Sequence, residues 1–183
     1  MEETRIIKEK KKQFYKYAVA LTDIRAALAS CEMIINDYDN LLNKNYDLFI
    51  SLHTSIIVNY AKPFTDNKPL GRLPKKFSSF QDSTYQEMHK QLIDLRNQFV
   101  AHSDYNMRKV HIYPKNTQLM KTGHFASGLG FTVSSIILDK ALYEKIFEVG
   151  KYLINLLYKD VFQLLDELFD NQFLPNHSFE LVI

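Results

Sequence analysis

The sequence predicts an all-α protein, an up-and-down four-helix bundle with a small β-hairpin inserted before the last long helix. Apolar residues recur at a period near 3.6 over several long stretches, which is typical of amphipathic helices. Only five glycines and five prolines interrupt the 183 residues. Two short pieces ahead of the last helix are instead rich in β-branched and aromatic residues, as strands are. A bundle buries four amphipathic stripes economically.

The first helix is expected over roughly residues 3–36. Its apolar or small residues form two rows at heptad spacing: Ile7, Phe14, Leu21, Leu28 and Ile35, then Tyr17, Ile24 and Cys31. The run KEKKK (8–12) is interpreted as a solvated helix face, with an RNA-facing patch as the alternative. The following stretch NDYDNLLNKN (36–45) is expected to be a polar connection that holds at most a frayed helical turn.

The second helix is expected over roughly residues 46–61, with His53 inside its apolar stripe. Pro63 should end it, because a proline disfavours helical geometry in the residue before it. A long loop follows, PFTDNKPLGRLPKKFSS (63–79), which is rich in basic residues. A structureless loop of this length is uncommon inside a compact domain and is often functional.

The third helix should begin at a capping box of Thr84 and Glu87 and run to about His102. KVHIY (109–113) and FTVSSI (131–136) are the expected strands of a hairpin insertion over about 108–137. Asp139 is expected to cap the last helix, which should reach about residue 170. The remaining tail, about 171–183, has no helical period and is expected to be extended.

Composition favours one soluble domain over residues 1–183. The net charge is only +2, so any nucleic-acid binding must come from a local patch. The N-terminus resembles no signal peptide, and no run approaches the roughly 18 apolar residues of a membrane span. A cytoplasmic protein without membrane contact is therefore expected. The single cysteine, the lack of a Glu-x-x-His pair and the lack of a phosphate-binding loop predict no metal and no cofactor.

The stretch LRNQFVAHSDY (95–105) carries the strongest chemical signal. On a straight helix Arg96 and His102 lie about 120° and about 9 Å apart, too far to grip one small group together. Across a two-fold axis, however, the two residues of both copies could meet in one cleft. Histidine suits general acid–base catalysis and arginine binds phosphate bidentately, so this cleft could cut RNA without a metal. The alternative is an ordinary helix end, where the dipole favours a histidine.

R-N-Q-F-V-A-H at 96–102 resembles the R-x4-6-H signature of the HEPN domain (higher eukaryotes and prokaryotes nucleotide-binding). NYAKPF (59–64), the loop after it and LRNQFVAHSD (95–104) are similar to bacterial HEPN proteins of abortive-infection and toxin–antitoxin loci. In one toxin branch a tyrosine stands two residues after the histidine. Here Asp104 holds that place and Tyr105 follows it, which argues against an adenylylated-tyrosine mechanism.

The resemblance implies a homodimeric, metal-independent endoribonuclease in phage defence or a toxin–antitoxin system. It implies Arg96 and His102 as catalytic residues, supported by Asn97, and RNA and an antitoxin or other protein as partners. Candidate substrate-binding residues are His89, Lys62, Lys75 and Lys76. The alternative function is a catalytically inactive HEPN-like helical module that binds a partner protein or nucleic acid.

Overall fold

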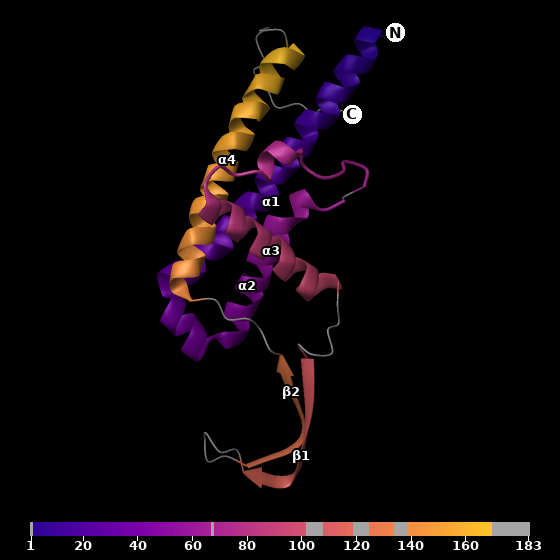
Figure 1. The fold of residues 1–183 in the computed structure, drawn as a ribbon. Coiled ribbons are helices and arrows are strands. Elements are labelled where there is room, and N and C mark those ends of the chain that lie inside the picture. The colour runs from indigo at the N-terminus through magenta and orange to yellow at the C-terminus, as the bar shows by residue number, and fades with distance from the viewer. Residues whose placement is uncertain (1, 67, 102–107, 119–124, 134–138, 170–183) are drawn as a thin grey trace, which may run out of the picture.

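The computed structural model describes residues 2–66, 68–101, 108–118, 125–133 and 139–169. Its helices are α1 (Glu2–Lys44), α2 (Tyr46–Ala61), α3 (Ser83–Ala101) and α4 (Lys140–Phe169). Two short 3-10 turns, η1 (Lys62–Phe64) and η2 (Lys75–Phe77), lie between α2 and α3. The predicted all-α class, with four helices, is confirmed. The strands β1 (Arg108–Gln118) and β2 (Phe125–Val133) pair antiparallel, from Arg108 opposite Val133 to Gln118 opposite Phe125. They lie at one end of the helical body (Figure 1).

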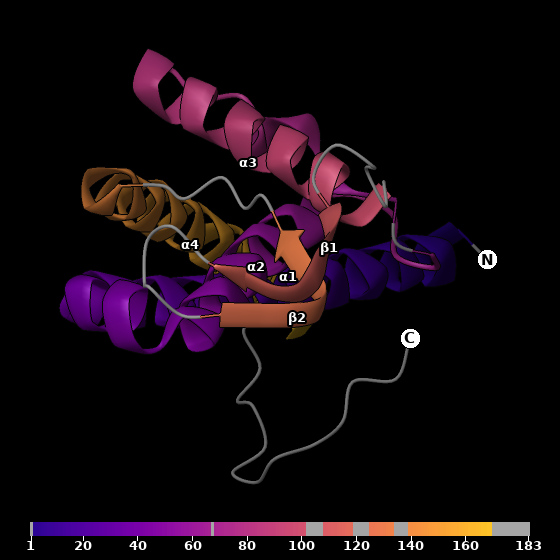
Figure 2. The same ribbon diagram turned by 90° about the horizontal axis from the view of Figure 1, so that it is seen from below.

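Two long helices, α1 and α4, lie side by side and run in opposite directions, while α3 crosses obliquely over the body (Figures 1 and 2). An ion pair between Lys10 and Glu167 joins the start of α1 to the end of α4. α2 packs against α1, and α3 packs against α2 and α4. Gly150 lets α4 approach α1 closely, since a Cβ at this position would lie 3.1 Å from Leu28 Cγ.

The core is built by the stripes that the sequence predicts. Tyr17, Ile24 and Cys31 of α1 are fully buried, and so are Phe49, His53, Ile56 and Tyr60 of α2. From α4, Ile146, Val149, Leu153 and Leu157 join them. Ile7, at the start of the other predicted row of α1, remains exposed because this end of the helix extends beyond the other elements.

α1 extends eight residues beyond its predicted end. A break at Asp37, with φ −135° and ψ 33°, interrupts its geometry, and the helix then resumes to Lys44. The polar connection expected at 36–45 is therefore helical over most of its length. Two apolar contacts explain the continuation: Leu41 is buried, and the Tyr38 ring packs edge-on against Phe49 with centroids 5.8 Å apart.

The start of α3 also differs from the prediction. Asp82 caps the helix, because its Oδ1 accepts hydrogen bonds from the backbone N–H groups of Thr84 (2.7 Å) and Tyr85 (3.2 Å). The backbone N–H of Thr84 is therefore one of the groups that Asp82 caps, and the Thr84 side chain is not the cap itself. At α4 the predicted cap is confirmed, since Asp139 Oδ1 accepts from the Leu142 N–H at 2.8 Å.

The basic loop before α3 is anchored to the body at several points. Leu73 and Phe77 are buried, and the Leu73 N–H donates to the Pro63 carbonyl at 2.8 Å. Gly71 adopts a φ of +68°, which a residue with a side chain would adopt at a cost. The loop is consequently packed against the helices and is not the structureless connection that the sequence suggested.

Candidate functional site

Arg96 lies near the C-terminal end of α3 at the edge of its buried face. Leu92 and Leu95 place this face of the helix in the core, and the Arg96 side chain beside them is half-buried. Its guanidinium Nη1 donates to Asn97 Oδ1 at 3.2 Å. Within the described part of the chain, this guanidinium forms no ion pair.

Asn97 is exposed, so the Arg96–Asn97 pair is open to solvent. A guanidinium that has one N–H held by an amide oxygen keeps its remaining N–H groups for another acceptor. Because arginine stays protonated throughout the physiological range, the pair offers a fixed positive charge with hydrogen-bond donors. This arrangement suits a phosphate group or a carboxylate.

His102, the predicted catalytic base, lies outside the described residues. The structure therefore gives no distance between His102 and Arg96. The separation of about 120° and about 9 Å that an ideal helix implies remains the only geometric statement about this pair.

His89 lies inside the protein and does not line a surface cleft with Arg96. Its side chain is 6% exposed, and its Nδ1 is 3.1 Å from the hydroxyl of Tyr60. The rings of Phe64 and Phe80 flank it at centroid distances of 4.6 and 5.4 Å. Burial lowers the pKa of His89 to about 4, so it is neutral near pH 7. These contacts give His89 a structural role in joining α2, the loop and α3.

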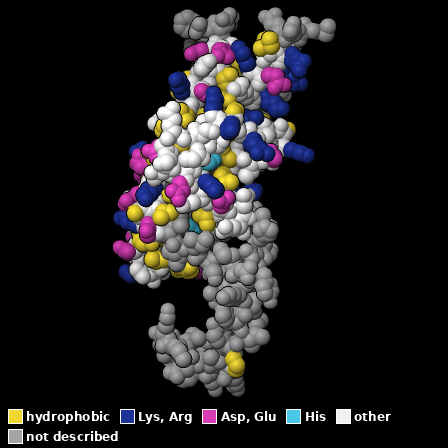
Figure 3. Space-filling view, viewed as in Figure 1, with side chains coloured by type: hydrophobic (Ala, Val, Ile, Leu, Met, Phe, Trp, Pro, Cys, Tyr) yellow, Lys and Arg dark blue, Asp and Glu magenta, His cyan; other side chains and the backbone are white. Residues whose placement is uncertain are grey.

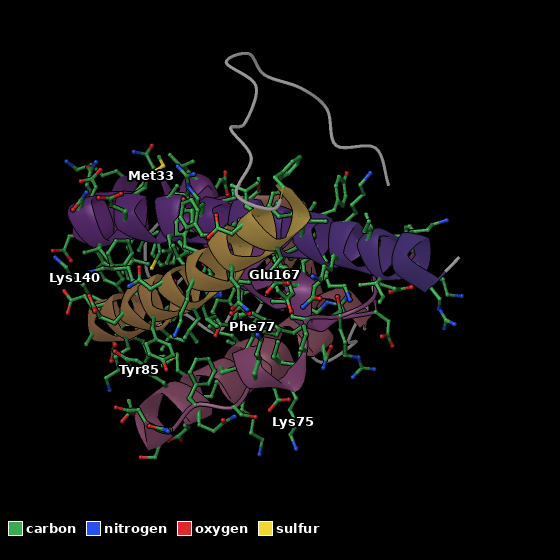
Figure 4. All side chains as sticks on the ribbon, turned by 90° about the horizontal axis from the view of Figure 1, so that it is seen from above. Met33, Lys75, Phe77, Tyr85, Lys140 and Glu167 are labelled. Carbon is green, nitrogen blue, oxygen red and sulfur yellow. The ribbon has the colours of Figure 1, made fainter. Side chains whose placement is uncertain are left out.

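The three candidate lysines differ in their surroundings. Lys62 Nζ is 2.7 Å from Asp23 Oδ1, and the Asp23 side chain is only 11% exposed. Lys76 forms an ion pair with Asp160 and lies over the Phe77 ring, 5.1 Å from its centroid. Lys75 is exposed and forms no ion pair within the described residues. Figure 4 shows it at the outer edge of the molecule. Of the three, Lys75 is the one whose charge is available to a ligand.

A separate groove of about 620 Å³ lies where α1, α3 and α4 meet. Three carboxylates, Glu32, Glu144 and Glu148, line it together with the apolar side chains of Ile35 and Phe147. Arg96 and Asn97 are not among its lining residues. The groove was not predicted, because its walls come from three helices that are distant in the sequence.

The described residues contain no group of three or more His, Cys, Asp or Glu side chains that could hold a metal ion. Within the same residues, no helix has the length and apolar character needed to cross a membrane.

Comparisons with known proteins give no relative. No protein-family model, no curated protein and no solved structure matches this chain. A function is therefore inferred from the side chains described above and from the resemblance of the motif.

Proposed function

We propose that this chain is a HEPN-type helical bundle, with four helices running up and down and the β1–β2 hairpin as an insertion, that cleaves RNA as a homodimer without a metal. Phage defence or a toxin–antitoxin system is the proposed setting. One observation supports this proposal above the others: Arg96 is held by Asn97 Oδ1 and carries no counter-charge within the described residues.

In the proposed reaction His102 removes the proton of a ribose 2'-hydroxyl. The 2'-oxygen attacks the adjacent phosphorus, the bond from phosphorus to the 5'-oxygen breaks, and a proton passes to that leaving oxygen. The products are a 2',3'-cyclic phosphate and a 5'-hydroxyl. Arg96 stabilises the extra negative charge that builds on the phosphate oxygens in the transition state.

A second copy is part of the proposal because an ideal helix would hold Arg96 and His102 too far apart to act on one phosphate together. Two α3 helices related by a two-fold axis would bring two arginines and two histidines to one cleft. Asn97, which already holds Arg96, would keep the guanidinium oriented as the phosphate binds.

The test is cleavage of a 5'-labelled single-stranded RNA by purified protein in excess EDTA. We expect 2',3'-cyclic phosphate ends. We expect His102→Ala to lower the rate at least about 100-fold, as loss of a catalytic acid–base group does, and Arg96→Ala to lower it at least about 100-fold, as loss of a group that stabilises transition-state charge does. Lys90→Ala is the matched control, because Lys90 is an exposed cation on the same helix. Equal rates for all variants would trace the cleavage to a contaminant or another site.

Two further measurements separate the proposal from its alternative. Light scattering should give twice the mass of the 21.5 kDa chain. RNA binding without cleavage by the dimer would instead identify the inactive helical module.

A further inference from the structure

Positive charge is concentrated in two segments of the sequence. Residues 5–16 and 62–76 together hold eleven of the 23 Lys and Arg residues but only two of the 21 Asp and Glu residues. Their net charge is +9, so the rest of the chain carries −7. The overall charge of +2 hides this separation.

The fold brings these two segments to one face of the molecule. Lys16 Nζ donates to the Arg72 carbonyl oxygen at 3.4 Å, and Lys76 Nζ lies 5.9 Å from the centroid of the Tyr17 ring. Lys12 and Lys16 line a hollow of about 350 Å³ together with Glu9 of α1 and Pro74 of the loop. Figure 3 shows Lys and Arg side chains gathered over the region where Figure 1 places the N-terminal half of α1 and this loop.

Ion pairs within the chain neutralise part of this charge, and the other part has no such partner in the described part of the chain. Asp23, Asp66, Asp160 and Glu167 pair with Lys62, Arg72, Lys76 and Lys10 respectively. Within the described residues, no ion pair involves Lys8, Lys11, Lys12, Lys16, Lys68 or Lys75. The lysines without an ion pair therefore lie mainly near the start of α1, where the run KEKKK (8–12) was interpreted as a solvated helix face with an RNA-facing patch as the alternative.

An exposed aromatic ring lies in the middle of these lysines. At 100° per residue, Lys8, Lys11, Lys12 and Tyr15 fall within about 100° of arc, on the side of α1 opposite the buried Ile24. Tyr15 is 41% exposed. From Lys8 to Lys16 the face extends about 12 Å along the helix.

We propose that this lysine face of α1 (Lys8, Lys11, Lys12, Tyr15 and Lys16), together with Lys75, which follows Pro74 of the hollow in the sequence, binds the backbone of a single-stranded nucleic acid and stacks one base on Tyr15. Closely spaced cations neutralise phosphates, and an exposed ring supplies a stacking platform that accepts any base. The phosphates of a duplex would also bind these lysines, but its bases are already stacked on each other and cannot stack on Tyr15. The choice of RNA over DNA rests on the proposed function, whereas binding to the strand does not.

The test measures fluorescence anisotropy of a labelled 12-nucleotide single strand, as RNA and as DNA, between 50 and 200 mM KCl. The His102→Ala background prevents cleavage, so binding is measured whether or not the chain is a ribonuclease. Each phosphate neutralised contributes about −0.7 to the slope of log affinity against log salt for single strands. The triple variant Lys8→Gln/Lys11→Gln/Lys12→Gln should flatten this slope by about 2.

Tyr15→Ala should weaken binding roughly tenfold with an unchanged salt slope, because stacking is not ionic. Tyr15→Phe should bind like the parent. The matched control is Lys44→Gln/Lys90→Gln/Lys140→Gln, which removes three exposed cations elsewhere and should leave the slope unchanged. Circular dichroism should show all variants folded.

Three outcomes would overturn the proposal. They are equal losses in the two triple variants, an unchanged affinity of Tyr15→Ala, and binding to anionic phosphatidylserine vesicles without binding to either strand. Equal binding of DNA and RNA would support the surface while removing support for RNA as the natural ligand. Binding without cleavage by the chain with His102 intact would contradict the proposed ribonuclease function alone.

Discussion

The hydroxyl of Tyr143 lies 2.8 Å from Nδ1 of His53, and this hydrogen bond joins α4 to α2 in the middle of the core. Tyr60 and His89 repeat the arrangement between α2 and α3. Each histidine is buried, and burial lowers the pKa of both His53 and His89 to about 4. Two of the helix contacts thus depend on an uncharged imidazole.

Stability should consequently fall in mild acid. The folded pKa of each histidine lies below the 6.5 of an ordinary histidine, so protons bind the unfolded chain more readily. The stabilisation is complete above pH 6.5 and is lost as the pH falls toward 4. Urea unfolding should show a free energy of unfolding at pH 5.0 that is lower than at pH 7.5 by about 2 kcal/mol per histidine.

The double variant His53→Gln/His89→Gln provides the control. It should be less stable than the parent at pH 7.5, because the tyrosine contacts change, but its stability should vary less between pH 7.5 and 5.0. A parent protein equally stable at both pH values would contradict the conclusion that the two buried histidines are uncharged in the folded protein.

Gly150→Ala should destabilise the protein although alanine favours helices. The added Cβ would overlap Leu28 Cδ2, and overpacking a core costs about 1–3 kcal/mol. The gain in helix propensity is about 1 kcal/mol. In thermal unfolding, the loss should disappear when Leu28→Ala is added, so that the double variant is no less stable than Leu28→Ala alone. Additive losses would show that the two positions do not compete for space.

Asp82→Ala should cost about 1 kcal/mol of unfolding free energy, the usual value of a helix N-cap. Thr84→Ala should change it by less than about 0.5 kcal/mol, because the Thr84 side chain is not the cap. Chemical denaturation of both variants compares the two directly. A larger stability loss in Thr84→Ala than in Asp82→Ala would instead support the capping box expected from the sequence.

Substitutions of Lys62 and Lys75 should separate binding from stability. Lys62→Ala should lower the free energy of unfolding by about 1–3 kcal/mol, because it leaves the nearly buried Asp23 carboxylate without its partner. Lys75→Ala should leave stability unchanged and weaken single-strand binding. Denaturation and anisotropy on the same preparations test this. A stability loss in Lys75→Ala would assign this lysine a structural role.

Arg96→Lys should not rescue cleavage, even though the charge is kept. A lysine ammonium lacks the planar fork that binds two phosphate oxygens together, and it reaches Asn97 differently. Asn97→Ala should reduce the rate about tenfold through a less well oriented Arg96. Single-turnover rates at saturating protein measure both effects. Full activity of Arg96→Lys would show that Arg96 contributes only a positive charge and that bidentate phosphate binding is not needed.

Local patterns predicted those features that depend on neighbouring residues alone. The stripe of α2, the Asp139 cap and the buried row of Tyr17, Ile24 and Cys31 follow from helical periodicity and side-chain type. The continuation of α1 past Asp37 depends instead on Phe49, which the sequence places twelve residues away. Local sequence patterns cannot reveal this tertiary contact, so they predict a polar connection where the helix in fact continues.

In the candidate site, too, some features follow from the local sequence and others depend on tertiary contacts. The exposure of Asn97 beside Arg96 agrees with their places on a helical wheel. The burial of His89 does not follow from the wheel, since Phe64 and Phe80 reach it from the loop. Part of the lysine face was visible in the run KEKKK, but its proximity to Pro74 of the loop, the residue before Lys75, appears only in the folded chain.

The separation of +9 from −7 has a consequence before any contact is made. A basic segment on a molecule of low net charge attracts a polyanion before contact, and the field of the polyanion turns the molecule so that the N-terminal half of α1 arrives first. Such orientation acts on the association rate and weakens over a Debye length of about 8 Å at physiological salt. Salt should therefore slow the encounter itself, whichever strand the protein meets.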